Sequence, residues 1–181
     1  DRTPYFSWQA VTDPGNSGIY RYFVQADNDS LFAVPIVMFD STVYTNHTPG
    51  SSLPENSRIF WRVRARDNAG NFASWVSGVF NLDNAAPAAP VGFNISPDGW
   101  TSDPLFAFNW TNPSDISGIS MALYKIGSPP AYPYDSTGHF AGTPPGGYTA
   151  QATGTFVAYL WLVDNAGNVS HANRAQDTLR F

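Results

Sequence analysis

The residues best suited to chemistry lie in a five-residue motif that occurs twice. Residues 67–71 and residues 164–168 both read Asp-Asn-Ala-Gly-Asn, and the second copy begins 97 positions after the first. Carboxylate and amide oxygens bind calcium, which takes about 6 to 8 oxygen ligands. The same residue types also build tight turns, because Asp and Asn bond to nearby main chain and Gly adopts positive φ. The motif therefore predicts a turn first and a calcium site second.

Neither copy supplies a complete calcium site from one loop. Both lack the Asp-x-Asp-x-Asp-Gly order with which a single loop surrounds the ion. Further ligands would have to come from other segments, such as Asp27, Asp29 or Asp83. The candidate calcium ligands in the two motifs are Asp67, Asn68, Asn71, Asp164, Asn165 and Asn168. We predict no cofactor, keep calcium as the open alternative, and assign Gly70 and Gly167 a structural role in the turns.

Residues for catalysis are sparse. The chain has no Cys, so it offers no thiolate nucleophile, no disulfide and no Cys-based zinc site. His47, His139 and His171 occur singly, without a partner at the spacing of a metal site or a catalytic triad. We interpret them as polar surface residues. The sequence therefore predicts a protein that is not an enzyme and has no catalytic residue.

Charge and composition exclude two further classes of function. The formal net charge is −5, whereas nucleic-acid binding needs clustered Lys and Arg. A membrane-spanning helix needs about 20 consecutive apolar residues, and no apolar run in the sequence is that long. Lys125 is the only lysine and Glu55 the only glutamate, while hydrophobic residues make up 43% and aromatic residues 15% of the chain. We therefore predict an all-β protein with buried cores, no nucleic-acid partner and no membrane span.

The strands expected around these motifs alternate apolar and polar residues. Phe6 and Trp8 share one face of a strand, as do Phe108 and Trp110, and all four are assigned a structural role. Pro35 cannot donate a ladder hydrogen bond, so its strand is expected at a sheet edge. The expected strands cover residues 5–8, 19–26, 31–39, 58–66, 72–82, 91–95, 106–110, 156–163 and 175–181. Each five-residue motif therefore lies in the turn between the last two strands of its set.

The 97-residue repeat predicts two domains in tandem. The first covers residues 1–84, a Pro- and Ala-rich junction covers residues 85–90, and the second covers residues 91–181. The second domain has a strand before its Phe-x-Trp strand that the first domain lacks, and it carries a long loop at residues 127–154. We expect the first domain to receive this strand either from a longer polypeptide or from a neighbouring subunit that pairs with the exposed edge.

Three arginines share one face of a strand in the first domain. Arg62, Arg64 and Arg66 alternate with apolar residues that include Trp61, and Trp75 lies on the segment paired with them. A guanidinium group stacked on Trp contributes about 0.5 to 2 kcal/mol. A stabilising ladder of Arg and Trp is our first interpretation, with Trp61 also structural, and an anion or partner site is the second.

The corresponding strand of the second domain is apolar on both faces. Tyr159 and Trp161 occupy the face that does not fill the core, so something must cover them. We expect the loop at residues 127–154 to do so, and another molecule is the alternative.

Aromatic side chains of the second domain suggest one further surface. Aromatic rings stack on sugars, and several of them occur in segments of loop-like composition. The candidate glycan or partner surface consists of Trp100, Tyr132, Tyr134, Phe140 and Tyr148.

Taken in order, these motifs resemble a known domain family. The Phe-x-Trp strands, the Ser-Gly-Ile segments at residues 17–19 and 117–119, and the strands that end in Asp-Asn-Ala-Gly-Asn resemble fibronectin type III and related bacterial immunoglobulin-like domains. The chain is most similar to repeats of large secreted surface proteins of environmental bacteria such as the Chloroflexota. The resemblance implies two tandem β-sandwiches with an extracellular or cell-surface location.

The same resemblance implies a structural or adhesive function without catalysis. Such a module would act as a spacer or assemble edge to edge into a surface filament. Its partners would be flanking domains of a longer polypeptide or neighbouring copies. The alternative is a carbohydrate-binding module of a secreted enzyme, whose partners would be glycans.

Overall fold

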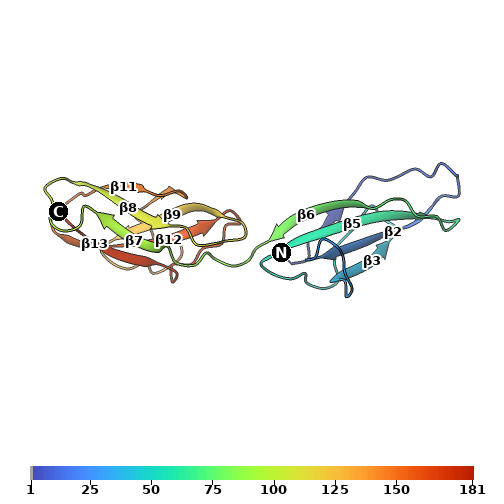
Figure 1. Cartoon of the computed structure of the whole chain (residues 1–181), viewed down its shortest axis with the longest axis horizontal. Coiled ribbons are helices and arrows are strands. Elements are labelled where there is room, and N and C mark those ends of the chain that lie inside the picture. Colours follow the sequence, from blue (N-terminus) through green and yellow to red (C-terminus); the bar gives the residue numbers. More distant parts are fainter. Residues whose placement is uncertain (1) are drawn as a thin grey trace. The chain divides into compact units, whose positions relative to one another are not determined.

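The protein consists of β-strands and connecting loops. The structure, a computed structural model, describes residues 2–181 and contains thirteen strands and no helix in that range. It divides into two compact units, one ending at Asp83 and the other covering Asn84–Phe181, and Figure 1 shows the strands of each unit. The predicted all-β fold with two tandem sandwiches is confirmed. No helix that could cross a membrane occurs in the part of the chain that the structure describes.

The second domain is a sandwich of two antiparallel sheets. Its strands are β7 (Val91–Ser96), β8 (Leu105–Thr111), β9 (Ile119–Ile126), β10 (Gly138–Ala141), β11 (Gly146–Thr149), β12 (Thr155–Asp164) and β13 (Ala175–Arg180). One sheet has the order β11-β8-β7 and the other the order β10-β9-β12-β13. Apolar residues of both sheets meet in one core around Phe108 and Leu160, which are 0% exposed.

The first domain has a similar pair of sheets. Its strands are β1 (Phe6–Ser7), β2 (Ile19–Asp27), β3 (Met38–Thr42), β4 (Asn46–His47), β5 (Ser57–Asp67) and β6 (Val76–Leu82). The sheets have the orders β1-β4 and β3-β2-β5-β6. The core consists of two clusters, one around Phe6 and Ile59 and the other around Val24 and Val63.

The two domains differ at one edge of the smaller sheet. The repeated motifs make β5 equivalent to β12, and the Phe-x-Trp pattern makes β1 equivalent to β8. β8 pairs with β11 on one side and with β7 on the other, whereas β1 pairs only with β4 among the strands of residues 2–83. The described part of the first domain therefore has no counterpart of β7.

The strand expected at residues 31–39 was placed too early. It begins at Met38 and ends at Thr42, and it does lie at a sheet edge. The apolar residues before it do not share a buried face, because Leu31 and Val34 are 82% and 87% exposed. Because these residues bury no apolar face against the core, pairing with the sheet would gain little stability.

Two segments between the expected strands contain short strands. Residues 45–58 hold the short strand β4 and the core residue Leu53, which is 1% exposed. Residues 127–154 hold β10 and β11, each of only four residues. Glycine and proline punctuate both segments so densely that no alternation longer than a few residues is visible.

Candidate functional site

The repeated motif forms the same hydrogen-bonded turn in both domains. In the first, Asn71 donates its backbone N–H to Asp67 Oδ1 at 2.7 Å and its side-chain amide to Asp67 Oδ2 at 2.8 Å. In the second, Asn168 makes the same two bonds to Asp164, both at 2.8 Å. Gly70 and Gly167 have φ values of 96° and 89°, which other residue types rarely adopt. The interpretation of the motif as a turn is confirmed.

The second residue of each motif joins this turn to a distant loop. Asn68 donates its backbone N–H to Gly18 O at 2.9 Å and its side-chain amide to Ser17 O at 2.8 Å. Asn165 makes the corresponding bonds to Gly118 O and Ser117 O, both at 2.8 Å. The turn after β5 or β12 is thereby held to the loop before β2 or β9.

A further Asp completes the network in each domain. Asp13 accepts the backbone N–H of Gly18 at 2.9 Å, and Asp115 accepts that of Gly118 at 2.9 Å. We call the whole network the latch. Its members are Asp13, Ser17, Gly18, Asp67, Asn68 and Asn71 in the first domain, and Asp115, Ser117, Gly118, Asp164, Asn165 and Asn168 in the second. Both halves recur in the sequence, but their contact could not be read from the spacing.

Hydrogen bonding stabilises the ionised carboxylates of the first latch. The bond from the Asn71 side chain holds the pKa of Asp67 below its usual value. The bond from the Ser17 side chain does the same for the pKa of Asp13. Both groups are therefore acceptors at neutral pH, as the latch requires.

The candidate calcium ligands are the same residues that hold the latch together. Asp67 and Asp164 each accept two hydrogen bonds, and the side-chain amides of Asn68 and Asn165 donate to carbonyl groups. In the second domain, a carboxylate oxygen of Asp115 also lies within 4.8 Å of one of Asp164. The carboxylate oxygens already accept hydrogen bonds within the turn. Calcium binding stays an open alternative.

The arginines of β5 stack between aromatic rings, which confirms the predicted ladder. The Arg62 guanidinium lies 4.5 Å from the Trp75 ring centroid, and that of Arg64 lies 4.4 Å from it. Phe32 covers Arg62 at 4.0 Å, and Phe72 covers Arg64 at 4.0 Å. Each such contact contributes about 0.5 to 2 kcal/mol.

The ladder is longer than the sequence predicted. Arg66 lies 5.4 Å from Phe72 and 5.7 Å from Tyr20, and Arg21 lies 4.7 Å from Tyr20. A β-bulge between Ile19 and Arg21 turns Tyr20 away from the core, where strict alternation would have placed it. Within residues 2–181, none of these guanidinium groups forms an ion pair with a carboxylate.

On the apolar outer face of β12, Trp161 is covered by residues 127–137, which belong to the loop expected to cover this face, and Arg174 lies over Tyr159. Trp161 is 0% exposed and donates its Nε1–H to the carbonyl of Pro133 at 2.7 Å. Asp135 fixes this loop, because it pairs with Lys125 at 2.6 Å and accepts the backbone N–H of Ala131 at 2.8 Å. The bond from Lys125 lowers the pKa of Asp135. The chain itself therefore shields this face.

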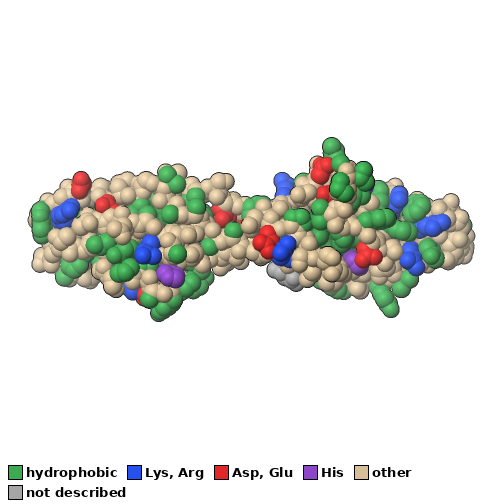
Figure 2. Space-filling model, turned by 90° about the horizontal axis from the view of Figure 1, so that it is seen from below, with side chains coloured by type: hydrophobic (Ala, Val, Ile, Leu, Met, Phe, Trp, Pro, Cys, Tyr) green, Lys and Arg blue, Asp and Glu red, His purple; other side chains and the backbone are tan. Residues whose placement is uncertain are grey.

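The five aromatic residues proposed as a glycan surface do not form one surface. Phe140 stacks on Tyr124 in the core with 4.6 Å between ring centroids, and Tyr148 packs against Phe108. Burial accordingly raises the pKa of Tyr148. The prediction is wrong for these two residues because they lie on β10 and β11, which were taken for loop. The remaining three residues are exposed, namely Trp100 (71%), Tyr132 (59%) and Tyr134 (58%). Figure 2 shows hydrophobic side chains among the polar atoms on one face of each domain.

The three histidines do not converge on a reactive centre. His47 lies on β4 with its Nε2 3.2 Å from Asp40 Oδ2. His139 is exposed on β10, and the carbonyl of His171 accepts a bond from Arg174. Each histidine thus has separate local surroundings.

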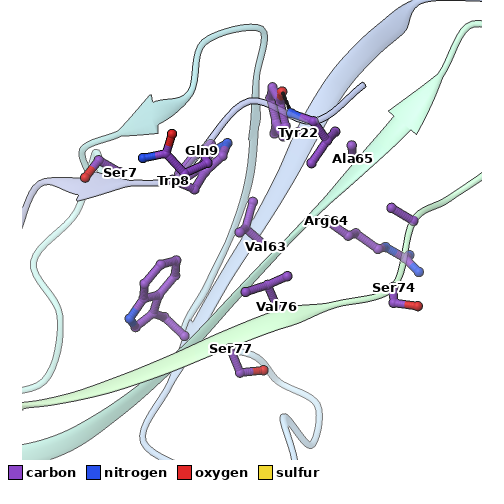
Figure 3. A pocket seen from close by; sticks show the side chains of 13 residues that line it. Ser7, Trp8, Gln9, Tyr22, Val63, Arg64, Ala65, Ser74, Val76 and Ser77 are labelled. Atoms are coloured by element: carbon purple, nitrogen blue, oxygen red, sulfur yellow. Dashed lines mark hydrogen bonds between the residues drawn. The ribbon is translucent and has the colours of Figure 1, made fainter. Parts of the chain in front are cut away.

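The first domain contains an apolar pocket between β1 and the sheet of β5 and β6. Its volume is about 390 Å³, and Figure 3 shows Trp8, Val63 and Val76 around it. Trp61 and Tyr22 also line the pocket. A pocket of this size falls within the ordinary range for bound ligands, about 300 to 1,000 Å³. Sequence reasoning predicted the exposed edge of this domain but not the pocket, because its lining residues come from segments that are distant in the sequence.

The chain matches no protein-family model, and no curated protein is significantly similar to it. Among solved structures, it is similar to the crystal structure of the chicken CNTN1 FN1-FN3 domains, with a TM-score of 0.48 and 11% sequence identity. The match covers 100% of this chain and 63% of that chain. The chain thus spans less than two thirds of the length of the protein that it resembles.

Proposed function

We propose that this chain is a non-catalytic structural module of an extracellular or cell-surface protein, and that it acts as a spacer. The latch is the observation that carries the proposal. In both domains the Asp and Asn side chains that could bind a ligand are bonded to one another or to main-chain groups, in the same arrangement. They connect the turn that ends β5 or β12 to the loop that begins β2 or β9. Such bonds resist separation of neighbouring strands when the module is pulled.

Single-molecule force spectroscopy on the whole chain tests this proposal. Two unfolding events are expected, with contour lengths of roughly 300 and 350 Å released at about 3.6 Å per residue. Asn68→Ala should lower the unfolding force of the first domain and Asn165→Ala that of the second. Extension of the wild-type chain without a resolved force peak would contradict a spacer function.

A spacer could also assemble edge to edge into a filament. The unpaired edge of β1 supports this version, because an open strand edge is a template for pairing with another chain. Light scattering over a range of concentrations tests it. A single monomeric species throughout would exclude filament assembly and would leave the spacer function intact.

Carbohydrate binding is a second candidate, favoured by the exposure of three aromatic residues. Tyr132 and Tyr134 lie in one loop of the second domain and offer ring faces for sugars. Affinity electrophoresis on a panel of polysaccharides would reveal binding as retardation. Retardation should weaken in a Tyr132→Ala, Tyr134→Ala double variant, with Tyr44→Ala in the first domain as the matched exposed control. Equal mobility on every polysaccharide would exclude this function.

A further inference from the structure

In the second domain, β7 closes the edge of the sandwich next to β8 and β13. Ile95 of β7 pairs with Phe108 of β8 and is 3% exposed. Its backbone N–H is bonded to Asp177 Oδ2 of β13 at 2.7 Å. Phe93, two residues earlier, packs against the same core. One extended strand therefore completes the sheet of β8 and covers the inner face of the opposite sheet.

The inner face of the first domain is open at the corresponding place. Val76 of β6 is the direct cross-strand partner of Val63, which is 4% exposed in the core. Directly opposite residues point to the same side of a sheet. Val76 therefore points toward the sandwich interior, yet it is 66% exposed. The pocket lies over this uncovered apolar surface, as Figure 3 shows.

On the edge of β1 beside this pocket, main-chain groups have no partner within residues 2–181. Trp8 donates its backbone N–H to Thr45 O at 3.0 Å, on the side of β4. Successive residues of an antiparallel strand direct their N–H and C=O groups to alternate sides. Ser7 and Gln9 therefore direct theirs to the opposite edge, and both residues are exposed and line the pocket.

Trp8, which lines the pocket, has a buried polar atom that lacks a partner among the described residues. Within residues 2–181, the Nε1–H of Trp8 has no hydrogen-bond acceptor. Its counterpart in the second domain, Trp110, donates to Asn112 Oδ1 at 2.7 Å. Ala10 stands where Asn112 stands in the second domain and offers no such acceptor. A buried Trp N–H usually finds a partner, and a main-chain carbonyl is a common one.

We propose that this groove binds an extended β-strand that is not part of residues 2–181. The strand pairs antiparallel with the free edge of β1 and carries two apolar side chains, two residues apart, that cover Val63 and Val76. Its chemistry is that of Phe93 and Ile95 in β7. A compact apolar ligand would fill the volume but would leave the main-chain groups of Ser7 and Gln9 unpaired. The unpaired edge therefore favours a peptide strand over a small molecule.

A peptide titration of the isotope-labelled whole chain, followed by its NMR amide resonances, tests the proposal. The peptide has the sequence of residues 90–98, Pro-Val-Gly-Phe-Asn-Ile-Ser-Pro-Asp. Saturable shifts are expected at Ser7, Gln9 and Ser77. A control peptide with Asp in place of both the Phe and the Ile should bind at least ~10-fold more weakly, because charged side chains cannot be buried on this surface.

A matched pair of variants locates the binding surface. Val76→Asp should weaken binding about tenfold or more, because it places a charge in the groove. Val79→Asp changes the opposite face of the same strand, where Val79 pairs with Phe60, and should leave binding unchanged. Retained amide dispersion shows that both variants are folded.

Four results would overturn the proposal. The first three are no saturable shift with the first peptide, equal binding of both peptides, and unchanged binding to the Val76→Asp variant. The fourth is self-association of the chain that Val76→Asp abolishes, since that would assign the groove to the edge-to-edge assembly of copies of this chain.

Discussion

Arg64 and Trp161 occupy the same position in two equivalent strands, three residues before the Asp of the repeated motif. In the first domain, the flat guanidinium group of Arg64 lies between Trp75 and Phe72. Such a stack covers apolar surface and keeps its charged edge in water. In the second domain, Trp161 needs complete cover, and a loop supplies it. One fold thus stabilises the outer face of the same strand in two ways.

The inner faces of the two domains differ in a related way. In the second domain, Ala158 and Asp177 form a cross-strand pair. Ala158 has a small side chain, and the Asp177 carboxylate accepts a hydrogen bond from β7. In the first domain, the equivalent pair is Trp61 and Gly78, and the Trp61 ring lies directly over the glycine. In the first domain the Trp61 ring thus lies at the position that β7 covers in the second domain. The groove remains beside this ring.

Truncating Trp161 should produce the largest effect. Trp161→Ala removes a fully buried ring and its bond to Pro133, so the second domain should lose about 3–5 kcal/mol of unfolding free energy. Arg64→Ala removes two stacking contacts and should destabilise the first domain by only about 1–2 kcal/mol. Urea titration followed through amide resonances of each domain measures both values separately. Equal losses would show that the ladder is as deeply packed as the covered face.

Adding one methyl group tests the inner face. A Cβ at Gly78 would lie 2.5 Å from Trp61 Nε1, so Gly78→Ala should destabilise the first domain by about 1–3 kcal/mol. The same substitution combined with Trp61→Ala removes the clash. In that background Gly78→Ala should change the free energy of unfolding by only a few tenths of a kcal/mol. A full effect in both backgrounds would mean that the glycine is needed for backbone reasons and that Trp61 does not fill this space.

Sequence reasoning located the strands with a long regular pattern of apolar residues. β2, β5 and β8 bury one face over several residues, and β12 is a long apolar run. β9 was not among the expected strands, although it has eight residues. β10 and β11 were missed because four residues rich in Gly give too few alternations. Both segments of the latch recur in the sequence and could be recognised there. The contact between them depends on tertiary structure and could not be predicted. Comparison of the two repeats predicted the strand that the first domain lacks, but the pocket beside that edge depends on how side chains from distant segments pack.

The latch is where the two domains agree, so its disruption should have matched effects. Asn68→Ala and Asn165→Ala each remove a side-chain bond of 2.8 Å to the carbonyl of a serine. A net loss of about 0.5–1.5 kcal/mol is expected for each domain. Urea titration compares the two directly. Effects that differ by more than about 1 kcal/mol would mean that the latch stabilises only one of the two domains.

Acid should lower the stability of the first domain by less than the Asn68→Ala substitution does. Bonding to Asn71 lowers the pKa of Asp67 in the folded state, so the unfolded chain binds a proton more readily as the pH falls. The stabilisation by Asp67 is therefore complete above the ordinary Asp pKa of about 3.9 and is lost as the pH falls through the lower, folded value. Asn71→Ala removes the principal cause and should raise the pKa of Asp67 toward the ordinary value, measured by NMR titration of the side-chain carboxyl carbon. Asn168→Ala changes only the equivalent turn of the second domain and should leave that titration unchanged. If Asp67 titrates at the ordinary value in the wild-type chain, its carboxylate does not hold the turn in solution. The two latches would then be alike in sequence but not in their hydrogen bonds.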